Sequence, residues 1–472
     1  KAILEVRNPK DLEIMEKIYA NSVLLGDQSE QGWGIKYAQG DFNMTNDSHL
    51  FKPRPWWEER GYQPDEYGRW IGPDGDVALP LYEGRMIGQF DFSEKGWVSG
   101  KGRSAVWHDI SWDHKIFEPQ YLMTIENYIL EDANKSNIIK SSLRVGFMAI
   151  GSATNIRSMV STTISEYPCG NSVAILKAYS NMLTLAIVST FNSFTYDYVL
   201  RAKLGGLNLN YFVISETPLL HHEYSQYLYR FAARLSLVHL SFAKEWLWLK
   251  VNNQFTQRSA WARMWALSDH ERLRLRCVLE ALIAQFYGLH WEDLAWILRD
   301  CDHPAGKISE KAFARTLDPK GFWRVDKDKD PELRHTVLTL IAFNDLKTMI
   351  KANGNDRDKG IEAFCNQNDG EGWMLPETLC LADYGLGHDD RAKSSQPVRS
   401  RMGERFLPWQ LEQTVEESWA ECERHALNIL GEKGFAQLMK EIENEKSDLT
   451  AQETPPVYLK AAEESEYVYD KE

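Results

Sequence analysis

Apolar residues recur at helical spacing along much of this chain. After an Asn8-Pro9 break, this spacing predicts a helix within residues 1–25, following a short strand at residues 2–6. The same period runs through residues 221–300, 332–350 and 408–444, and Ser268-Asp269-His270-Glu271 is typical of a helix start. The second half of the chain is therefore predicted to be mainly helical.

The stretch from residue 172 to residue 201 is almost continuously apolar. We predict a single helix here, capped at its start by Asn171-Ser172 and ended by Gly205-Gly206. Residues 208–214 are predicted to form a strand or extended segment before Pro218.

The first third of the chain has a different pattern. Residues 26–80 are rich in Gly, Pro, Asp and Trp, with a tight turn at Gly72-Pro73-Asp74-Gly75, which predicts long loops with short strands. Residues 80–160 are predicted to be β-rich, because residues 138–150 alternate. The predicted fold class is α+β: a mixed α/β domain at residues 1–220, a mainly helical region at 221–440, and an acidic, loosely held tail at 441–472.

Charge is unevenly distributed in this 472-residue chain. The net charge of −14 argues against a generally basic nucleic-acid surface. Residues 137–250, however, hold ten Lys and Arg against five Asp and Glu. Because salt screens charge within about 8–10 Å, a locally basic face can still bind a polyanion. The seventeen Trp residues suit core packing or stacking on bases.

No metal site is predicted. The six Cys residues include no Cys-x-x-Cys pair, and their scattered spacing fits a reducing cytoplasm. Asp326, Asp328 and Asp330 alternate as in a calcium loop, but Pro331 and Val337 replace the Gly and Glu that such a loop requires. The Asp383–Asp390 loop, with His388, is interpreted as a structural or interdomain contact.

The chain shows no signal peptide and no apolar run long enough for a membrane span. It begins at Lys1 inside an alternating apolar pattern, and we expect it to be a fragment or an excised domain of a cytoplasmic protein.

Several motifs lie in a fixed order. Met44-Thr45-Asn46-Asp47-Ser48 is followed by Pro80-Leu81-Tyr82-Glu83-Gly84-Arg85-Met86-Ile87, and then by Thr154-Asn155-Ile156-Arg157-Ser158. Next come Asn192, Ser193, Asp197, Tyr198 and Arg201, then Gly205-Gly206. Finally there are Leu381-Ala382-Asp383-Tyr384-Gly385 and Pro408-Trp409-Gln410. As a set, these resemble the target-recognition and C-terminal region of adenine-specific DNA methyltransferases of restriction-modification and phage-defence systems, of the type IIG kind. Arg85 stands where the family has Lys, and Ser158 where it has Thr.

The resemblance implies double-stranded DNA as partner. The candidate DNA-binding residues are Tyr82, Gly84, Arg85, Thr154, Asn155, Arg157, Asn192, Arg201, Asn208 and Asn210. Alternatives remain open for some of them: an ion pair between Arg157 and Asp197, helix-terminal hydrogen bonds for Asn192-Ser193, and a structural turn at residues 82–84 that holds a catalytic partner.

The catalytic half of such an enzyme is not in this chain. Neither Asn-Pro-Pro nor Asp-Pro-Pro occurs, and Gly32-Trp33-Gly34 and Gly385-Leu386-Gly387 lack the strand–loop–helix context of a methyl-donor site. We therefore predict no catalytic residue and no cofactor here. S-adenosylmethionine is implied for a catalytic domain on this or another chain. The alternative function is a non-enzymatic scaffold that docks helicase or nuclease subunits of a defence complex through the Trp-rich helices at residues 240–300.

Overall fold

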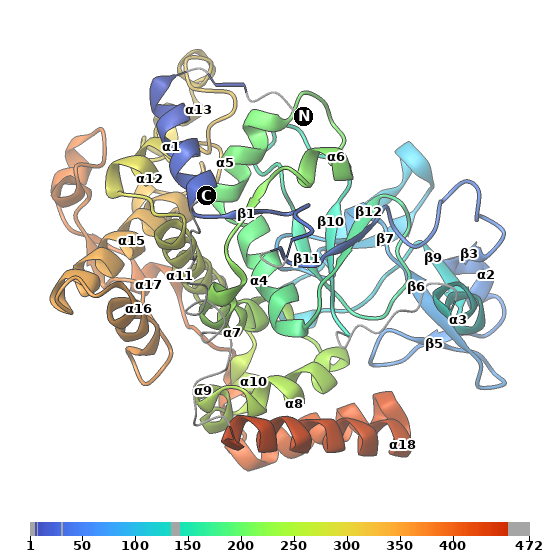
Figure 1. Ribbon diagram of the computed structural model, residues 1–472. Coiled ribbons are helices and arrows are strands. Elements are labelled where there is room, and N and C mark those ends of the chain that lie inside the picture. The colour runs from blue at the N-terminus through green and yellow to red at the C-terminus, as the bar shows by residue number, and fades with distance from the viewer. Residues whose placement is uncertain (1–4, 7, 30–31, 134–141, 452–472) are drawn as a thin grey trace, which may run out of the picture.

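The computed structural model describes residues 5–451, apart from residue 7 and the segments 30–31 and 134–141. The described chain combines antiparallel sheets in its first half with a large helical body (Figure 1). This confirms the predicted α+β class with a helical C-terminal region. Most of the strand predicted at residues 2–6 lies outside the described residues.

Two sheets make up the β-rich part. One has the order β11 (Ser161–Ile164), β10 (Arg144–Met148), β12 (Val173–Lys177) and β2 (Lys36–Ala38). The other has the order β3 (Phe51–Pro53), β9 (Tyr121–Thr124), β6 (Val77–Leu81), β5 (Trp70–Ile71) and β4 (Gln63–Pro64). All their neighbouring strands are antiparallel. Three further pairs are β1 (Val23–Leu24) with β13 (Pro218–Leu219), β7 (Lys95–Ser99) with β8 (Val106–Asp109), and β14 (Thr378–Leu379) with β15 (Gln396–Pro397).

The helical body is built around α11 (Asp269–Phe286), which is buried along nearly its whole length. It packs against α15 (His335–Ala352) and α7 (Ser225–Ser236), while α4 (Asn181–Phe191) connects α7 to the four-stranded sheet. The other longer helices are α1 (Pro9–Ala20), α3 (Ile125–Ala133), α5 (Phe194–Lys203), α8 (Ala243–Val251), α16 (Arg357–Asn366) and α18 (Val415–Ala451). The short ones are α2 (Arg54–Glu58), α6 (Tyr211–Ile214), α9 (Gln254–Arg258), α10 (Trp261–Met264), α12 (Trp291–Ile297), α13 (Ala305–Ser309), α14 (Lys311–Ala314) and α17 (Arg399–Met402).

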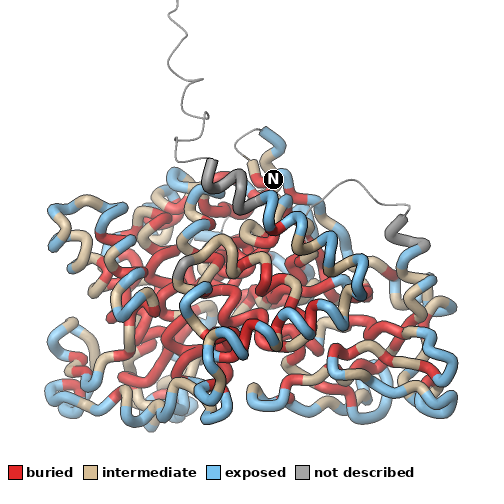
Figure 2. Tube along the Cα trace, turned by 90° about the horizontal axis from the view of Figure 1, so that it is seen from below, coloured by how far each residue is buried: buried red, intermediate tan, exposed pale blue. Residues whose placement is uncertain are grey.

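One hydrophobic core extends through both halves of the chain. It runs from Ile14 to Ile442 and includes residues of the four-stranded sheet as well as α7, α11 and α15. Figure 2 shows this continuous buried interior, with exposed positions on its outside. The predicted boundary near residue 220 follows β13, but the two regions on either side of it share a core instead of forming two separate ones.

The stretch 172–201 differs from the single helix that its sequence predicts. Residues 173–177 form β12, and α4 begins only at Asn181, where the Ser180 hydroxyl caps the amide of Leu183. Because β12 lies between β10 and β2 and is buried, its apolar residues show no alternation that would distinguish a strand from a helix.

Three helix boundaries can be compared with their sequence predictions. Ser268 caps α11 through the amide of Glu271, at 3.1 Å, as predicted. Residues 211–214 form the short helix α6 instead of a strand, because the Asn210 side chain caps them. Residues 441–451 continue α18 instead of belonging to the tail, and residues 452–472 lie outside the described part.

Candidate nucleic-acid interface

Two of the predicted DNA-binding arginines lie inside the protein around Asp197. The Asp197 carboxylate, on α5, accepts hydrogen bonds from Arg157 Nε at 2.9 Å and Arg201 Nε at 3.3 Å, and from the backbone amide of Ser158 at 3.1 Å. Burial would raise the pKa of this carboxyl, but the charges of Arg201 and Arg157 outweigh it and leave the pKa below its usual value. The ion pair between Arg157 and Asp197, one of the two alternatives for Arg157, is therefore present.

The remaining donors of these arginines also bond within the protein. Arg201 donates to the backbone oxygens of Asn155 at 2.9 Å and Ile156 at 2.8 Å, and on its other side to Lys320 at 2.7 Å. Arg157 donates to the backbone oxygen of Asn192 at 2.6 Å. The two guanidinium groups thus tie the 152–158 loop to α5 and to the 320–321 loop.

Tyr82 and Asn192 are also enclosed. Tyr82 is 1% exposed and its ring packs against Phe117 and Tyr167. The Asn192 side chain makes two hydrogen bonds to the backbone of Ser161 in β11, accepting at 3.0 Å and donating at 2.8 Å. Together with Arg157 and Arg201, these side chains are unavailable to DNA. For these four residues the predicted contact role is corrected to a structural one.

The other six candidates lie at or near the surface. Arg85, Thr154, Asn155, Asn208 and Asn210 are exposed, and Gly84 is half-buried. The backbone bonds of Arg201 to residues 155 and 156 hold the loop that carries Thr154 and Asn155 in place. The buried Arg201 therefore fixes the position of the exposed residues Thr154 and Asn155.

Gly84 belongs to a turn that is packed tightly against the start of β12. Its amide donates to the Ser172 hydroxyl at 2.9 Å, and a Cβ at this position would lie 2.9 Å from the Ser172 backbone oxygen. Only glycine allows this approach. It brings Glu83 and Arg85 to the edge of a hollow of about 290 Å³.

This hollow joins three segments that are distant in sequence. Its lining includes Glu83, Gly84 and Arg85 from the turn, Gly102, Ala105 and Trp107 from the β7–β8 hairpin, and Met148 and Ile150 at the end of β10 and just after it. Ile150 forms a β-bridge with Asn208, and the amide of Gly151 donates to Leu207. The segment that carries Asn208 therefore pairs with a strand end that lines the same hollow as Arg85.

The hairpin contributes basic residues that the sequence reasoning missed. Lys101 and Arg103 are exposed at its tip, where Gly100 and Gly102 just before them have left-handed conformations. Arg85 reaches this hairpin, because its Nη1 donates to the Ala105 backbone oxygen at 3.5 Å. In the sequence, Lys101-Gly102-Arg103 lies between two short alternating runs, a pattern that could have predicted a hairpin with a basic tip.

Glu83 and Trp107 leave polar atoms without partners in this hollow. Neither Glu83 Oε2 nor Trp107 Nε1 has a hydrogen-bond partner among the described residues, although both are buried. Burial raises the pKa of the Glu83 carboxyl to about 7, and Arg85 offsets this only in part. A carboxyl of this kind changes charge near neutral pH at the edge of the basic surface.

The Trp residues of the helices at residues 240–300 differ in burial. Trp246, Trp261 and Trp265 are at most 8% exposed, and the Nε1 group of Trp246 bonds the Leu237 backbone oxygen. Trp248, Trp291 and Trp296 are half-buried.

No protein-family model matches this chain, and no curated protein matches it either. Its likeness to the methyltransferase recognition region rests on the sequence motifs alone.

The described residues provide neither a metal site nor a membrane-spanning helix. No group of three or more His, Cys, Asp or Glu side chains there could hold a metal ion. None of the helices in that part of the chain combines the length and apolar character needed to cross a bilayer. In place of a calcium loop, Asp326 accepts a hydrogen bond from the His335 amide and Asp330 pairs with Arg401.

Neither glycine pair has the strand–loop–helix setting of a methyl-donor site in the described part of the chain. Gly32-Trp33-Gly34 precedes β2 and does not follow a strand into a helix, and Gly385-Leu386-Gly387 lies between two 3₁₀ turns. These residues do not fit S-adenosylmethionine, and no methyl-transfer step is assigned to them.

Proposed function

We propose that this chain is the DNA-recognition part of an adenine-specific, S-adenosylmethionine-dependent DNA methyltransferase of a restriction-modification or phage-defence system. Methyl transfer then belongs to a catalytic domain with its own donor site. The chain holds duplex DNA in register for that domain.

The observation that carries the proposal is the hollow where the Gly84-Arg85 turn meets the β7–β8 hairpin, whose tip exposes Lys101 and Arg103. Ile150, which also lines this hollow, pairs with Asn208, so a further motif segment borders it. Basic side chains bind phosphates and fix register, while Arg and Asn side chains read base edges in the major groove. The surface is thus locally basic on a protein of net charge −14.

Duplex binding at low and at physiological salt tests the proposal. We expect Lys101→Ala/Arg103→Ala to weaken binding and to lower the dependence of log K on log salt by about one for each phosphate-binding side chain that is removed. Arg85→Ala should weaken binding by roughly 1–3 kcal/mol if its guanidinium contacts a base.

The matched control is Lys359→Ala. This lysine is 73% exposed on α16, far along the chain from the hairpin, and its replacement should leave affinity unchanged. Duplex affinity and salt dependence that stay the same in both interface variants would show that this surface does not bind DNA.

A further inference from the structure

A large, arginine-rich hollow lies mainly among the helices of the second half of the chain, and its lining shares no residue with the hollow beside Arg85. It has a volume of about 1370 Å³. Four arginines line it: Arg230 on α7, Arg258 at the end of α9, Arg263 on α10 and Arg405. The acidic residues of its lining are Asp369 and Glu371.

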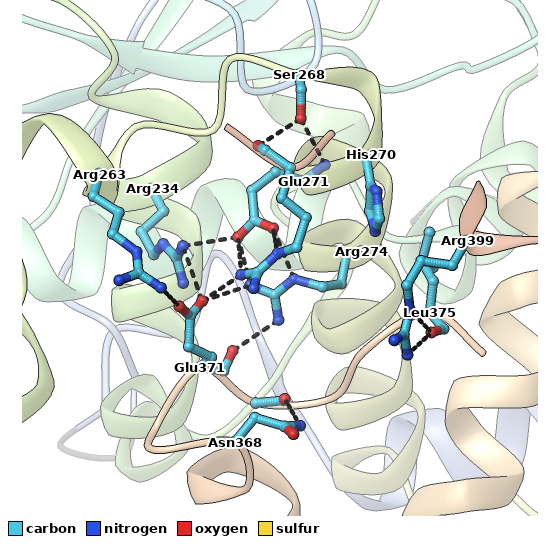
Figure 3. A network of polar contacts seen from close by, with 12 residues as sticks. Arg234, Arg263, Ser268, His270, Glu271, Arg274, Asn368, Glu371, Leu375 and Arg399 are labelled. Carbon is cyan, nitrogen blue, oxygen red and sulfur yellow. Dashed lines mark hydrogen bonds and ion pairs between the residues drawn. The ribbon is translucent and has the colours of Figure 1, made fainter. Parts of the chain in front are cut away.

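A buried network of arginines and glutamates forms the floor of this cavity (Figure 3). Glu271 accepts from Arg234 Nη2 at 2.7 Å, Arg274 Nε at 2.9 Å and Arg405 Nε at 2.8 Å. Glu371 accepts from Arg263 Nη2 at 2.8 Å and also pairs with Arg405. The network therefore holds four guanidinium groups against two carboxylates.

The excess of positive charge is not neutralised nearby. Nη1 of Arg234, a residue 2% exposed, has no partner in the described structure, and burial lowers the pKa of this guanidinium to about 10 even though Glu271 and Glu371 raise it. Confining like charges away from water is costly unless an anion compensates them.

Two further arginines extend the positive charge toward the open side. Arg230 bonds neutral acceptors, the Asn366 side-chain oxygen at 3.2 Å and the Cys365 backbone oxygen at 2.7 Å, and its buried Nε has no partner among the described residues. Within that same described part, Arg258 is exposed and makes neither an ion pair nor a hydrogen bond. Asp369 offsets one of these charges at most.

The rest of the lining suits a phosphorylated ligand with a flat group. Ser180 and Met182 place the N-terminus of α4 at the cavity, and the positive end of a helix dipole favours phosphate there. Phe255 and Trp248 offer half-buried aromatic faces, and Asn252 and Asn253 offer amides. Guanidinium groups match phosphate better than any other side chain, because they can donate two parallel hydrogen bonds.

We propose that this cavity is a second anion site that binds the phosphate groups of a nucleotide. Arg230 and Arg258 contact the phosphates directly, and the network of Arg234, Arg263, Arg274 and Arg405 supplies the positive field behind them. The site is separate from the duplex surface around Arg85 and does not depend on it.

Calorimetric titration of the full chain at low salt tests this, with tripolyphosphate, adenosine triphosphate and a short single-stranded oligonucleotide as separate probes. We expect Arg230→Ala and Arg258→Ala each to weaken binding by about tenfold or more, since each removes a charge-assisted contact. Arg258→Glu should weaken it further. Arg258 is exposed and unpaired among the described residues, so its variants should keep the wild-type melting temperature.

The control is Arg315→Ala, at an exposed arginine that follows α14 and does not line the cavity. Binding of tripolyphosphate and of the triphosphate, each weakened by the cavity variants alone, supports a nucleotide site. Cavity-dependent binding of the oligonucleotide alone would assign the same phosphate chemistry to a strand. Absence of binding by all three probes, or equal binding by wild type and Arg258→Glu, would overturn the proposal.

The two proposals can fail independently. Lys101→Ala/Arg103→Ala is expected to leave triphosphate affinity at the wild-type value while it lowers duplex affinity. The Arg230 and Arg258 variants are expected to lower triphosphate affinity and to leave duplex affinity at the wild-type value.

Discussion

At the scale of single residues, arginines from neighbouring motifs have different roles. Arg157 and Arg201 share the carboxylate of Asp197, which is 0% exposed, whereas Arg85 is exposed beside the β7–β8 hairpin. Spacing in the sequence identified all three but could not rank them, because burial depends on what the rest of the fold places over each side chain. The buried pair maintains the loop that carries Thr154 and Asn155.

Arg201→Ala is therefore expected to affect stability and not contact with DNA. It leaves Asp197 with one guanidinium partner and removes the bonds to residues 155 and 156, so the free energy of unfolding should fall by about 3 kcal/mol or more. Urea denaturation measures this. Wild-type stability combined with a large drop in duplex affinity would instead restore Arg201 as a direct contact.

Glu83→Gln should change how duplex affinity depends on pH. With a pKa of about 7, the Glu83 carboxyl is mostly neutral at pH 6 and mostly ionised at pH 8, where its negative charge repels phosphates near Arg85. Affinity of the wild type should fall as pH rises through this range, and the variant should show a smaller fall. Parallel binding curves for the two proteins from pH 6 to pH 8 would contradict the role of this carboxyl.

At the scale of elements, the interface depends on close packing between a turn and a strand. The 3₁₀ turn at Gly84–Met86 rests on Ser172, just before β12, and this contact sets the position of Arg85 at the hollow. The run 172–201 predicted a helix in that place, so the sequence alone could not have suggested the contact. The hairpin that completes the hollow was expected only as part of a β-rich stretch.

Gly84→Ala tests this packing. The added Cβ would lie 2.9 Å from the Ser172 backbone oxygen, which cannot move without shifting β12, so a decrease of about 1–3 kcal/mol in stability is expected together with weaker duplex binding. Gly306→Ala on α13 is the matched control, because its Cβ would meet nothing within 4 Å. Thermal melting of both variants is the measurement, and equal melting temperatures would refute the argument.

At the scale of the whole molecule, one core links the sheets to the helical body. Glu280 on α11 lies at this junction, where its carboxyl accepts from the Phe194 amide of α5 at 2.9 Å. Burial raises the pKa of Glu280 to about 8, and Arg157 offsets part of this increase. An ionisable group thus sits at the point where the two regions meet.

The contribution of Glu280 to stability should therefore fall as pH rises from about 5 to 8. The unfolded chain loses the Glu280 proton near the usual pKa of 4.5, while the folded chain keeps it until about 8, so rising pH favours unfolding in that window. The slope from this one group is at most about 1.4 kcal/mol per pH unit, and Glu83 adds to it in the same direction. Glu280→Gln should flatten the dependence measured by denaturation at several pH values, and an unchanged slope would refute this.

The sequence by itself determined the α+β class and the helical second half with its Ser268 cap, and it supplied the motifs from which DNA recognition is proposed. These follow from local rules: apolar period, capping chemistry and residue type at fixed spacing. Tertiary structure decided the rest. It buried Tyr82, Asn192 and Arg201, paired Arg157 with the buried Asp197 and left Arg85 exposed. It brought the hairpin that carries Lys101 and Arg103 to the Gly84-Arg85 turn. It also gathered arginines from α7, α9 and α10, and Arg405, around one cavity. The physical reason is that burial and charge balance are sums over neighbours from distant parts of the chain, and no local pattern contains them.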